Sequence, residues 1–418
     1  MIASDLSSEW VKINSCRTCE SNELVNVLDL GMHPLANSLL DVDDQYEITA
    51  PLVLIRCSAC TTIQLSVNVD PRFMFQNYLW VTGSTKTARQ HCENLAALIV
   101  KKCDKGNLRI LEIGSNDATL LQSLINKGAS QVYGVDPASN LQQENLPHNI
   151  KLYEGFFNHE LALKIQDEVE KVDVVVARNV LSHVPNLRDV MLGIEALVTD
   201  QSIVVIEFHD ASKILTELHY ESIYHEHTFY HSIRSIQAAL SRIAFKIFDV
   251  SPSPISGGSH VIFASRENKE ISLELEKALI DEEHSGVYHN DSWRDFASNT
   301  SNHLAQLRDI FKSEAQSTWL AFGASARSST LLNSIGPSAR ILRRIVDNNP
   351  LKQGKLSPGL KLPICDPRDT VDASVEKIFI CAFNFEEEIT SCLSEELGWR
   401  GEVILPLPLK IRRYKVLG

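Results

Sequence analysis

The stretch that decides the fold is Ile110-Leu111-Glu112-Ile113-Gly114-Ser115-Asn116-Asp117. Three apolar residues and one acid lead into a glycine, and apolar residues then recur at helical spacing at Leu120, Leu121 and Leu124. This pattern predicts a buried strand, a tight turn and the start of a helix. A glycine in such a turn lets a ligand approach the backbone, as α/β nucleotide-binding proteins require.

The same turn indicates which cofactor binds. It contains one glycine where a dinucleotide fingerprint has three, so it suits a pyrophosphate poorly. S-adenosylmethionine (SAM) has no pyrophosphate and fits better. A second strand at 131–136 ends in Asp136, whose carboxylate can accept hydrogen bonds from two ribose hydroxyls. The alternative is an ordinary strand–helix turn without a cofactor.

The rest of this region alternates strands and helices. A helix is expected at 86–100, and further strands at 172–179 and 203–207. This alternation predicts an open parallel sheet whose ligands sit at the carboxyl ends of the strands. We therefore expect contacts with SAM from the following residues: Glu112, Gly114, Asn116, Asp117, Asp136, Phe156 and Asn179.

The length, composition and charge of the chain predict a soluble globular protein. The chain has 418 residues, 44% of them hydrophobic and 22% charged, which allows two or three domains. A net charge of −13 without a basic block argues against nucleic acid as a partner. The sequence contains no long apolar run, so we expect no membrane span. The acidic N-terminus does not resemble a signal peptide. Nine cysteines, an odd number, favour a reducing compartment, and we expect the cytoplasm.

Two Cys-x-x-Cys pairs stand near the N-terminus. Cys16 and Cys19 form the first, and Cys57 and Cys60 the second. Four thiolates can close a tetrahedral zinc site that holds the fold and does no chemistry. Reduced surface thiols are the alternative. Between the pairs, the glycine and proline of 30–37 predict a turn.

The candidate catalytic stretch is Ile223-Tyr224-His225-Glu226-His227-Thr228-Phe229-Tyr230. Its histidines are two apart, not the four of a metalloprotease helix, so we expect a general base tuned by a carboxylate. The alternative is a surface histidine cluster with no catalytic role. A second phenol, Tyr78, lies before a Gly-Ser pair and could place its hydroxyl near the site.

The C-terminal part predicts helices over 266–316 and then a second strand–glycine–helix unit at 318–331. Ser325 and Arg327 stand at the start of that helix, which suits an anion such as a diphosphate. A plain capped helix is the alternative. A further strand at 345–347 leads into a polar loop with Lys352. This half therefore reads as a second α/β domain.

Residues 110–124, the stretch 177–186 and the two cysteine pairs together resemble the three-domain sugar C-methyltransferases, which act on nucleotide-linked 4-keto-6-deoxysugars. The resemblance covers nearly the whole chain. It implies a zinc-binding domain at 1–72, a Rossmann-like class I methyltransferase domain at 73–253 and a Rossmann-like, nucleotide-sugar-binding α/β domain at 254–418. The expected cofactors are SAM and structural zinc, and the expected partner is a small-molecule substrate.

The resemblance also implies residue roles. It matches Tyr224, Glu226 and His227 to the active-site residues of the family, with His227 as the base that removes the proton next to the ketone. Tyr224 or Tyr78 would hydrogen-bond the resulting oxyanion. Substrate contacts are expected from the following residues: His183, Ser325, Arg327 and Lys352.

One position departs from the family pattern. Ala118 stands where the family has glycine, and an alanine is tolerated there only if its φ is negative. Two alternative functions stay open. One is SAM-dependent methylation of oxygen or nitrogen on a related sugar or small molecule, and the other is a non-catalytic nucleotide-sugar-binding module.

Overall fold

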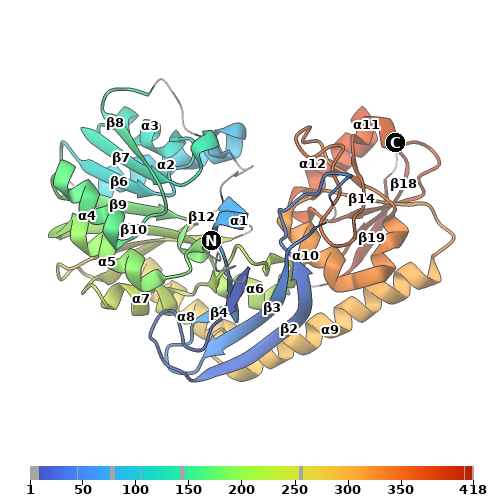
Figure 1. Cartoon of the computed structure of the whole chain (residues 1–418), viewed down its shortest axis with the longest axis horizontal. Coiled ribbons are helices and arrows are strands. Elements are labelled where there is room, and N and C mark those ends of the chain that lie inside the picture. The colour runs from blue at the N-terminus through green and yellow to red at the C-terminus, as the bar shows by residue number, and fades with distance from the viewer. Residues whose placement is uncertain are drawn as a thin grey trace, which may run out of the picture.

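A computed structural model describes residues 9–44, 46–75, 81–103, 105–141, 146–253, 258–408 and 410–416. Tyr78 lies outside these residues. Figure 1 shows two α/β bodies, one in cyan and green and the other in orange and red, with a blue N-terminal sheet between and below them. The described residues thus form three parts, as the sequence predicts.

The first α/β body is built on a seven-stranded sheet in the order β12-β13-β10-β9-β6-β7-β8. The run from β8 to β10 is parallel, and β13 is antiparallel to both of its neighbours. The strands are β6 (Arg109–Ile113), β7 (Gln131–Asp136), β8 (Ile150–Glu154), β9 (Val172–Arg178), β10 (Val198–His209), β12 (Lys246–Ser253) and β13 (Ser259–Ser265). The predicted strands at 110–113 and 131–136 are therefore confirmed.

Helices cover both faces of this sheet, because successive residues of a strand point to opposite sides. Ile110 packs with α2 (Lys86–Cys103) and α3 (Thr119–Asn126). Its neighbour Leu111 belongs to a second apolar cluster with α4 (His159–Glu168), α5 (Leu187–Leu197) and α7 (Ile233–Ser241). The sheet is buried on both faces, as its long apolar runs predict.

The N-terminal part is a four-stranded sheet in the order β11-β4-β3-β2, beside a two-stranded β1–β5 ribbon. Its elements are β1 (Trp10–Lys12), β2 (Leu24–Pro34), β3 (Thr49–Cys57), β4 (Ile63–Leu65), β5 (Val67–Val69) and α1 (Arg72–Phe75). The edge strand β11 (Phe229–Tyr230) comes from the candidate catalytic stretch, so the two parts share one sheet.

The prediction of a turn over 30–37 is wrong for its first half. Strand β2 continues to Pro34, and its register with β3 shifts between Asp29 and Met32. Gly31 has φ of 83° inside this irregularity. The glycine therefore supports a bulge within the strand, and the chain turns only after Pro34.

The second α/β body has a six-stranded sheet in the order β16-β15-β14-β17-β18-β19. Its strands are β14 (Trp319–Phe322), β15 (Ile345–Val346), β16 (Ile364–Cys365), β17 (Lys377–Ile380), β18 (Gly401–Leu405) and β19 (Arg412–Val416). Its helices are α10 (Ala326–Ile335), α11 (Pro367–Thr370) and α12 (Glu386–Ser391). All but β19 run parallel, which confirms a second Rossmann-like sheet.

Three helices join the bodies: α6 (Ala211–Thr216), α8 (Leu273–Ser285) and the long α9 (Asn290–Ser313). In Figure 1, α9 runs along the bottom of the molecule beneath β2 and β3 and reaches the orange body. Trp293 of α9 shares an apolar cluster with Leu54 of β3 and Phe379 of β17. None of the helices within the described ranges is long and apolar enough to cross a membrane.

Candidate active site and zinc site

The four paired cysteines converge at one point of the N-terminal domain. The Sγ atoms of Cys16 and Cys60 are 3.5 Å apart, and those of Cys19 and Cys57 are 3.6 Å apart. All four sulfur atoms lie within 4.8 Å of one another. A tetrahedron with Zn–S bonds of about 2.3 Å places its sulfurs at close to these separations. The residues therefore fit a closed structural zinc site, as predicted.

The turn after β6 is held by hydrogen bonds to its backbone and side chains. Gly114 has φ of 73°, and a Cβ there would lie 3.1 Å from the Val180 side chain. The Asn116 amide donates to Oδ2 of Asp136 (2.7 Å). The segment before α2 closes over the turn, because the amides of Thr82 and Gly83 donate to the side chains of Asn116 and Asp117. These contacts fix the backbone where SAM is predicted to bind.

Ala118 adopts the conformation that suits glycine. Its φ is 61° and its ψ is 17°, in the left-handed region, at the N-cap of α3. The φ of Ala118 is thus positive, not negative as an unstrained alanine requires. This conformation lowers the stability of the fold by about 1–2 kcal/mol. The contacts around Asn116 and Asp117 hold the turn in place despite this strain.

Asp136 and Asn179 stand at the carboxyl edge of the sheet, as predicted. Asp136 ends β7 and accepts hydrogen bonds from the amides of Asn116 and Ala138. Burial raises its pKa, and these two amides oppose the rise because they favour the charged form. Each carboxylate oxygen has a further lone pair, so the group can still accept from ribose hydroxyls. Phe156 is 40% exposed beside this edge.

Glu112 lies close enough to Asp117 and Asp136 for their charges to raise its pKa. Its side chain is fully buried, and Oε1 accepts a hydrogen bond from Nε of Arg178 at 3.0 Å. Burial raises the pKa of Glu112 to about 7, while Arg178 lowers it. Arg178 pairs with one oxygen of the carboxylate that we expected at the cofactor, and the contact of Glu112 with SAM stays a prediction.

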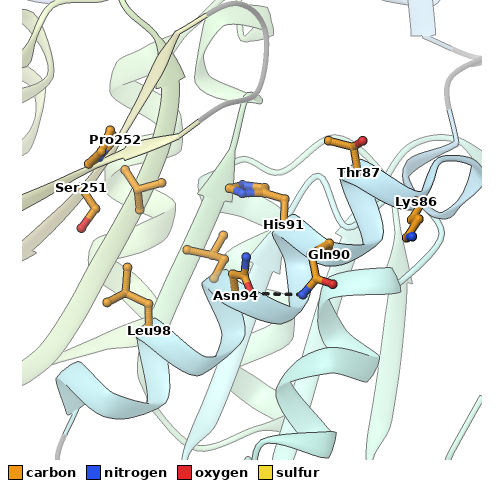
Figure 2. Close-up of a pocket in the computed structure, with 10 residues that line it drawn as sticks. Lys86, Thr87, Gln90, His91, Asn94, Leu98, Ser251 and Pro252 are labelled. Atoms are coloured by element: carbon orange, nitrogen blue, oxygen red, sulfur yellow. Dashed lines mark hydrogen bonds between the residues drawn. The ribbon is translucent and has the colours of Figure 1, made fainter. Parts of the chain in front are cut away.

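A cavity of about 440 Å³ lies between α2 and the strands β12 and β13. Figure 2 shows Gln90, His91 and Asn94 on the helix across from Ser251 and Pro252. His91 also contacts Glu207, with Nε2 2.9 Å from Oε1. Among the residues that the structure describes, none of the predicted site residues lines this cavity.

The candidate catalytic segment is almost completely enclosed. Of the residues from 218 to 233, only Tyr224 and His227 keep partial exposure. The Tyr224 hydroxyl lies 2.9 Å from Nε2 of His227. The His183 ring is 4.8 Å from the His227 ring, which brings the predicted residue His183 to the same place. The two side chains with exposed surface are thus the ones matched to the family's tyrosine and histidine.

His227 is held as a neutral imidazole. Burial lowers its pKa well below the usual value, and electrostatic repulsion from the His183, His209 and Arg327 side chains acts in the same direction. A hydrogen bond to the backbone of Ser222 opposes the shift. A neutral imidazole has one nitrogen with a free lone pair, which a general base requires.

Glu226 and His225 point to the N-terminal domain. Oε1 of Glu226 accepts a hydrogen bond from the Asn37 amide at 2.7 Å. Nε2 of His225 lies 3.2 Å from the backbone oxygen of Ala50. Within the described residues no hydrogen bond joins the Glu226 carboxylate to His227, so the expectation that this carboxylate tunes the base finds no support in the geometry.

The C-terminal residues have three different surroundings. Ser325 is the N-cap of α10 and forms a capping box with Ser328, which is the plain-helix alternative. Nζ of Lys352 donates to the Ala324 carbonyl at 2.8 Å and lies 3.3 Å from the Asp347 carboxylate. Arg327 faces the catalytic segment, with Nη1 3.9 Å from Oε1 of Glu221.

Two residues of the site escaped the sequence analysis. His209 ends β10 and lowers the pKa of His227, and the rule that ligands bind at carboxyl ends of strands could have identified it. Asn37 contacts Glu226 across 189 residues of sequence. No local pattern reports a contact of that range.

Three protein-family profiles match consecutive parts of the chain. A zinc-binding domain matches residues 16–75, a methyltransferase domain matches 85–250, and a C-methyltransferase C-terminal domain matches 254–408. The first two ranges lie in the N-terminal part and the first α/β body, whereas the third begins before β13 of the first sheet and continues through the second body.

The curated protein C-methyltransferase NovU from Streptomyces niveus is 28% identical over 404 residues, covering 95% of this chain and 96% of NovU. Two solved structures match less of the chain. Magnesium protoporphyrin IX methyltransferase from Synechocystis PCC 6803 is 19% identical with a TM-score of 0.34, covering 43% of this chain and 83% of that one. The PH0226 protein from Pyrococcus horikoshii OT3 is 14% identical with a TM-score of 0.35, covering 48% and 97%.

The whole-length match and the three profiles in this order agree with the geometry of the zinc and cofactor sites. The chain is a SAM-dependent methyltransferase that is similar to the C-methyltransferase NovU over nearly its whole length.

Proposed function

We propose that the chain methylates the carbon next to the ketone of a nucleotide-linked 4-keto-deoxysugar. The observation that carries this proposal is the Tyr224–His227 pair. The two side chains are in contact and partly exposed within a buried segment, and the imidazole is neutral. Carbon next to a ketone is a nucleophile only after it loses a proton, so this reaction needs such a base.

In this reaction His227 removes the proton from that carbon, which gives an enediolate. Tyr224 donates a hydrogen bond to the oxygen on which negative charge develops. SAM supplies a methyl group on a positively charged sulfur, and the enediolate carbon is the nucleophile that accepts it. A positioned base contributes about 10²–10⁴-fold, and alignment of two reactants contributes up to about 7–11 kcal/mol. Most of the acceleration therefore comes from how the domains hold the reactants.

Arg327 supports a nucleotide diphosphate as the remote part of the substrate. Its guanidinium extends from the start of α10 toward the catalytic segment, and a guanidinium matches phosphate oxygens in pairs. Ser325 and Lys352 lie at the same end of the second sheet. A nucleotide held there would place its sugar toward Tyr224 and His227.

Methylation of oxygen or nitrogen is the second candidate function. Those atoms are already nucleophilic and need a base less, so the neutral His227 favours carbon. We also propose the reducing cytoplasm as the setting, which suits nine cysteines that form no disulfide.

The test is mass spectrometry of products after incubation with a panel of nucleotide-linked 4-keto sugars and isotope-labelled SAM. A gain of one methyl group that withstands mild hydrolysis supports carbon as the acceptor. A methyl group released by that treatment would indicate oxygen, and no transfer to any member of the panel would overturn the sugar proposal.

A further inference from the structure

We propose that Asn37 is a positioning residue of the active site, through which the zinc-binding domain holds the Glu226 carboxyl and the turn that carries Tyr224 and His227. The inference rests on the proposed function only in taking that turn as the catalytic one. Asn37 would not touch the reacting atoms and would act through Glu226.

The first support is the contact itself. Nδ2 of Asn37 donates to Oε1 of Glu226 at 2.7 Å, from one domain to another. Glu226 is 3% exposed, whereas Asn37 is exposed on its other side. A buried carboxyl needs a hydrogen-bond donor, and losing that donor costs more than an ordinary hydrogen bond. The buried Glu226 therefore depends on this hydrogen bond more than the exposed Asn37 does.

The second support is the way Asn37 is held. Asn37 lies in a tight turn in which the Ser38 amide donates to the Leu35 carbonyl. Leu35 and Ala36 are buried, and Leu40 pairs with Leu356 of the C-terminal domain. The turn is thus anchored on both sides and can serve as a fixed support for the Glu226 side chain of the central domain.

The third support is that other contacts bind the same segment to the same domain. His225 meets the Ala50 carbonyl, and the Leu65 amide donates to the Thr228 carbonyl at 3.0 Å. Phe229 then pairs with Gln64. Asn37 is the member of this set whose side chain acts on a carboxyl group, so its loss changes chemistry as well as fit.

The surroundings of Glu226 make that change measurable. Burial raises its pKa to about 7, and the Asn37 hydrogen bond opposes the rise. Nδ1 of the neighbouring His183 lies 2.8 Å from the backbone oxygen of Glu226. Removing the Asn37 amide should therefore move the midpoint of the carboxyl titration to higher pH.

The experiment compares full-length Asn37→Ala with the control Asn26→Ala. Asn26 is exposed on β2 of the same domain, and its side chain forms no hydrogen bond within the described residues. Carboxyl NMR of protein labelled with ¹³C-glutamate follows the titration, and Glu226→Gln identifies the signal. We expect a higher midpoint in Asn37→Ala alone, a fall in kcat of about tenfold or more with a much smaller change in KM, and unchanged zinc content and SAM affinity.

Equal midpoints in Asn37→Ala and the wild type would overturn the inference. If Asn37→Ala loses zinc, Asn37→Ser replaces it, because serine also suits a turn. Failure of the proposed function would be seen separately. A wild-type protein that methylates no sugar of the panel would overturn that function, while the titration would still decide the role of Asn37.

Discussion

Nε2 of His227 and the hydroxyl of Tyr224 lie 2.9 Å apart, in a segment whose other side chains are enclosed. The hydroxyl can donate to the lone pair of the neutral imidazole, so one hydrogen bond orients the base and the oxyanion donor together. Substrate would replace this contact when it binds. The pair is preorganised because the N-terminal and C-terminal domains both pack against the segment that carries it.

Replacing His227 by alanine should reduce methyl transfer by about 10²–10⁴-fold, because it removes the general base. SAM affinity should stay unchanged, since the predicted cofactor contacts lie on other loops. The measurements are labelled-methyl transfer and calorimetric titration with SAM. His284→Ala, on the exposed face of α8, is the matched control. Near-normal transfer by the His227 variant would remove this residue from the mechanism.

Replacing Cys57 by serine should release zinc and lower both thermal stability and methyl transfer. Cys57 leads through a short loop into β4, which pairs with β11 of the catalytic segment. Metal content and the thermal unfolding midpoint measure the effect, and Cys103→Ser at the end of α2 is the control. Full activity in a zinc-free protein would show that the metal does not support the catalytic segment.

Replacing Asp136 by alanine should weaken SAM binding by about tenfold or more, because it removes the ribose acceptor and the partner of the Asn116 amide. Calorimetric titration with SAM measures the loss. Asp167→Ala, on the exposed side of α4, should bind as the wild type does. Unchanged affinity in the Asp136 variant would place the ribose elsewhere.

Glu282 gives a prediction about stability and pH. Burial raises its pKa to about 7, although the Tyr288 hydroxyl and the Ile233 amide donate to its carboxylate. A raised pKa means that the folded state binds the proton more tightly than the unfolded state. This contribution to stability is complete below the unfolded pKa and is lost as the pH rises through about 7.

Wild type should therefore lose stability relative to Glu282→Gln between pH 5 and pH 8, by up to about 3 kcal/mol. Urea unfolding of both proteins at each pH measures the difference. A difference in the free energy of unfolding that does not change with pH would show that Glu282 titrates normally in the folded protein.

The sequence was sufficient to predict alternating strands and helices and a parallel sheet in the central domain, because buried parallel strands leave long apolar runs. The run at 131–136 matches β7 to the residue. It was less informative at Gly31, because a bulge and a turn both use a glycine with positive φ. Ala118 shows the converse, a left-handed residue that no glycine marks.

For the site, motif spacing was enough to predict the zinc ligands, whose sulfur atoms converge as expected. Spacing could not predict where His225, Glu226 and His227 point. They lie in a turn and diverge toward Ala50, Asn37 and Tyr224. Those directions depend on a domain placed far away in the sequence, and a single sequence carries no signal for such contacts.

The pairing of β4 with β11 has a consequence for synthesis of the chain. The edge of β4 emerges from the ribosome more than 160 residues before Phe229 and Tyr230 can cover it. During that interval the small domain exposes unpaired backbone groups to other nascent chains. Truncated versions that stop before β11 should therefore be prone to aggregation, and domain exchange between relatives should succeed only if both strands are transferred together.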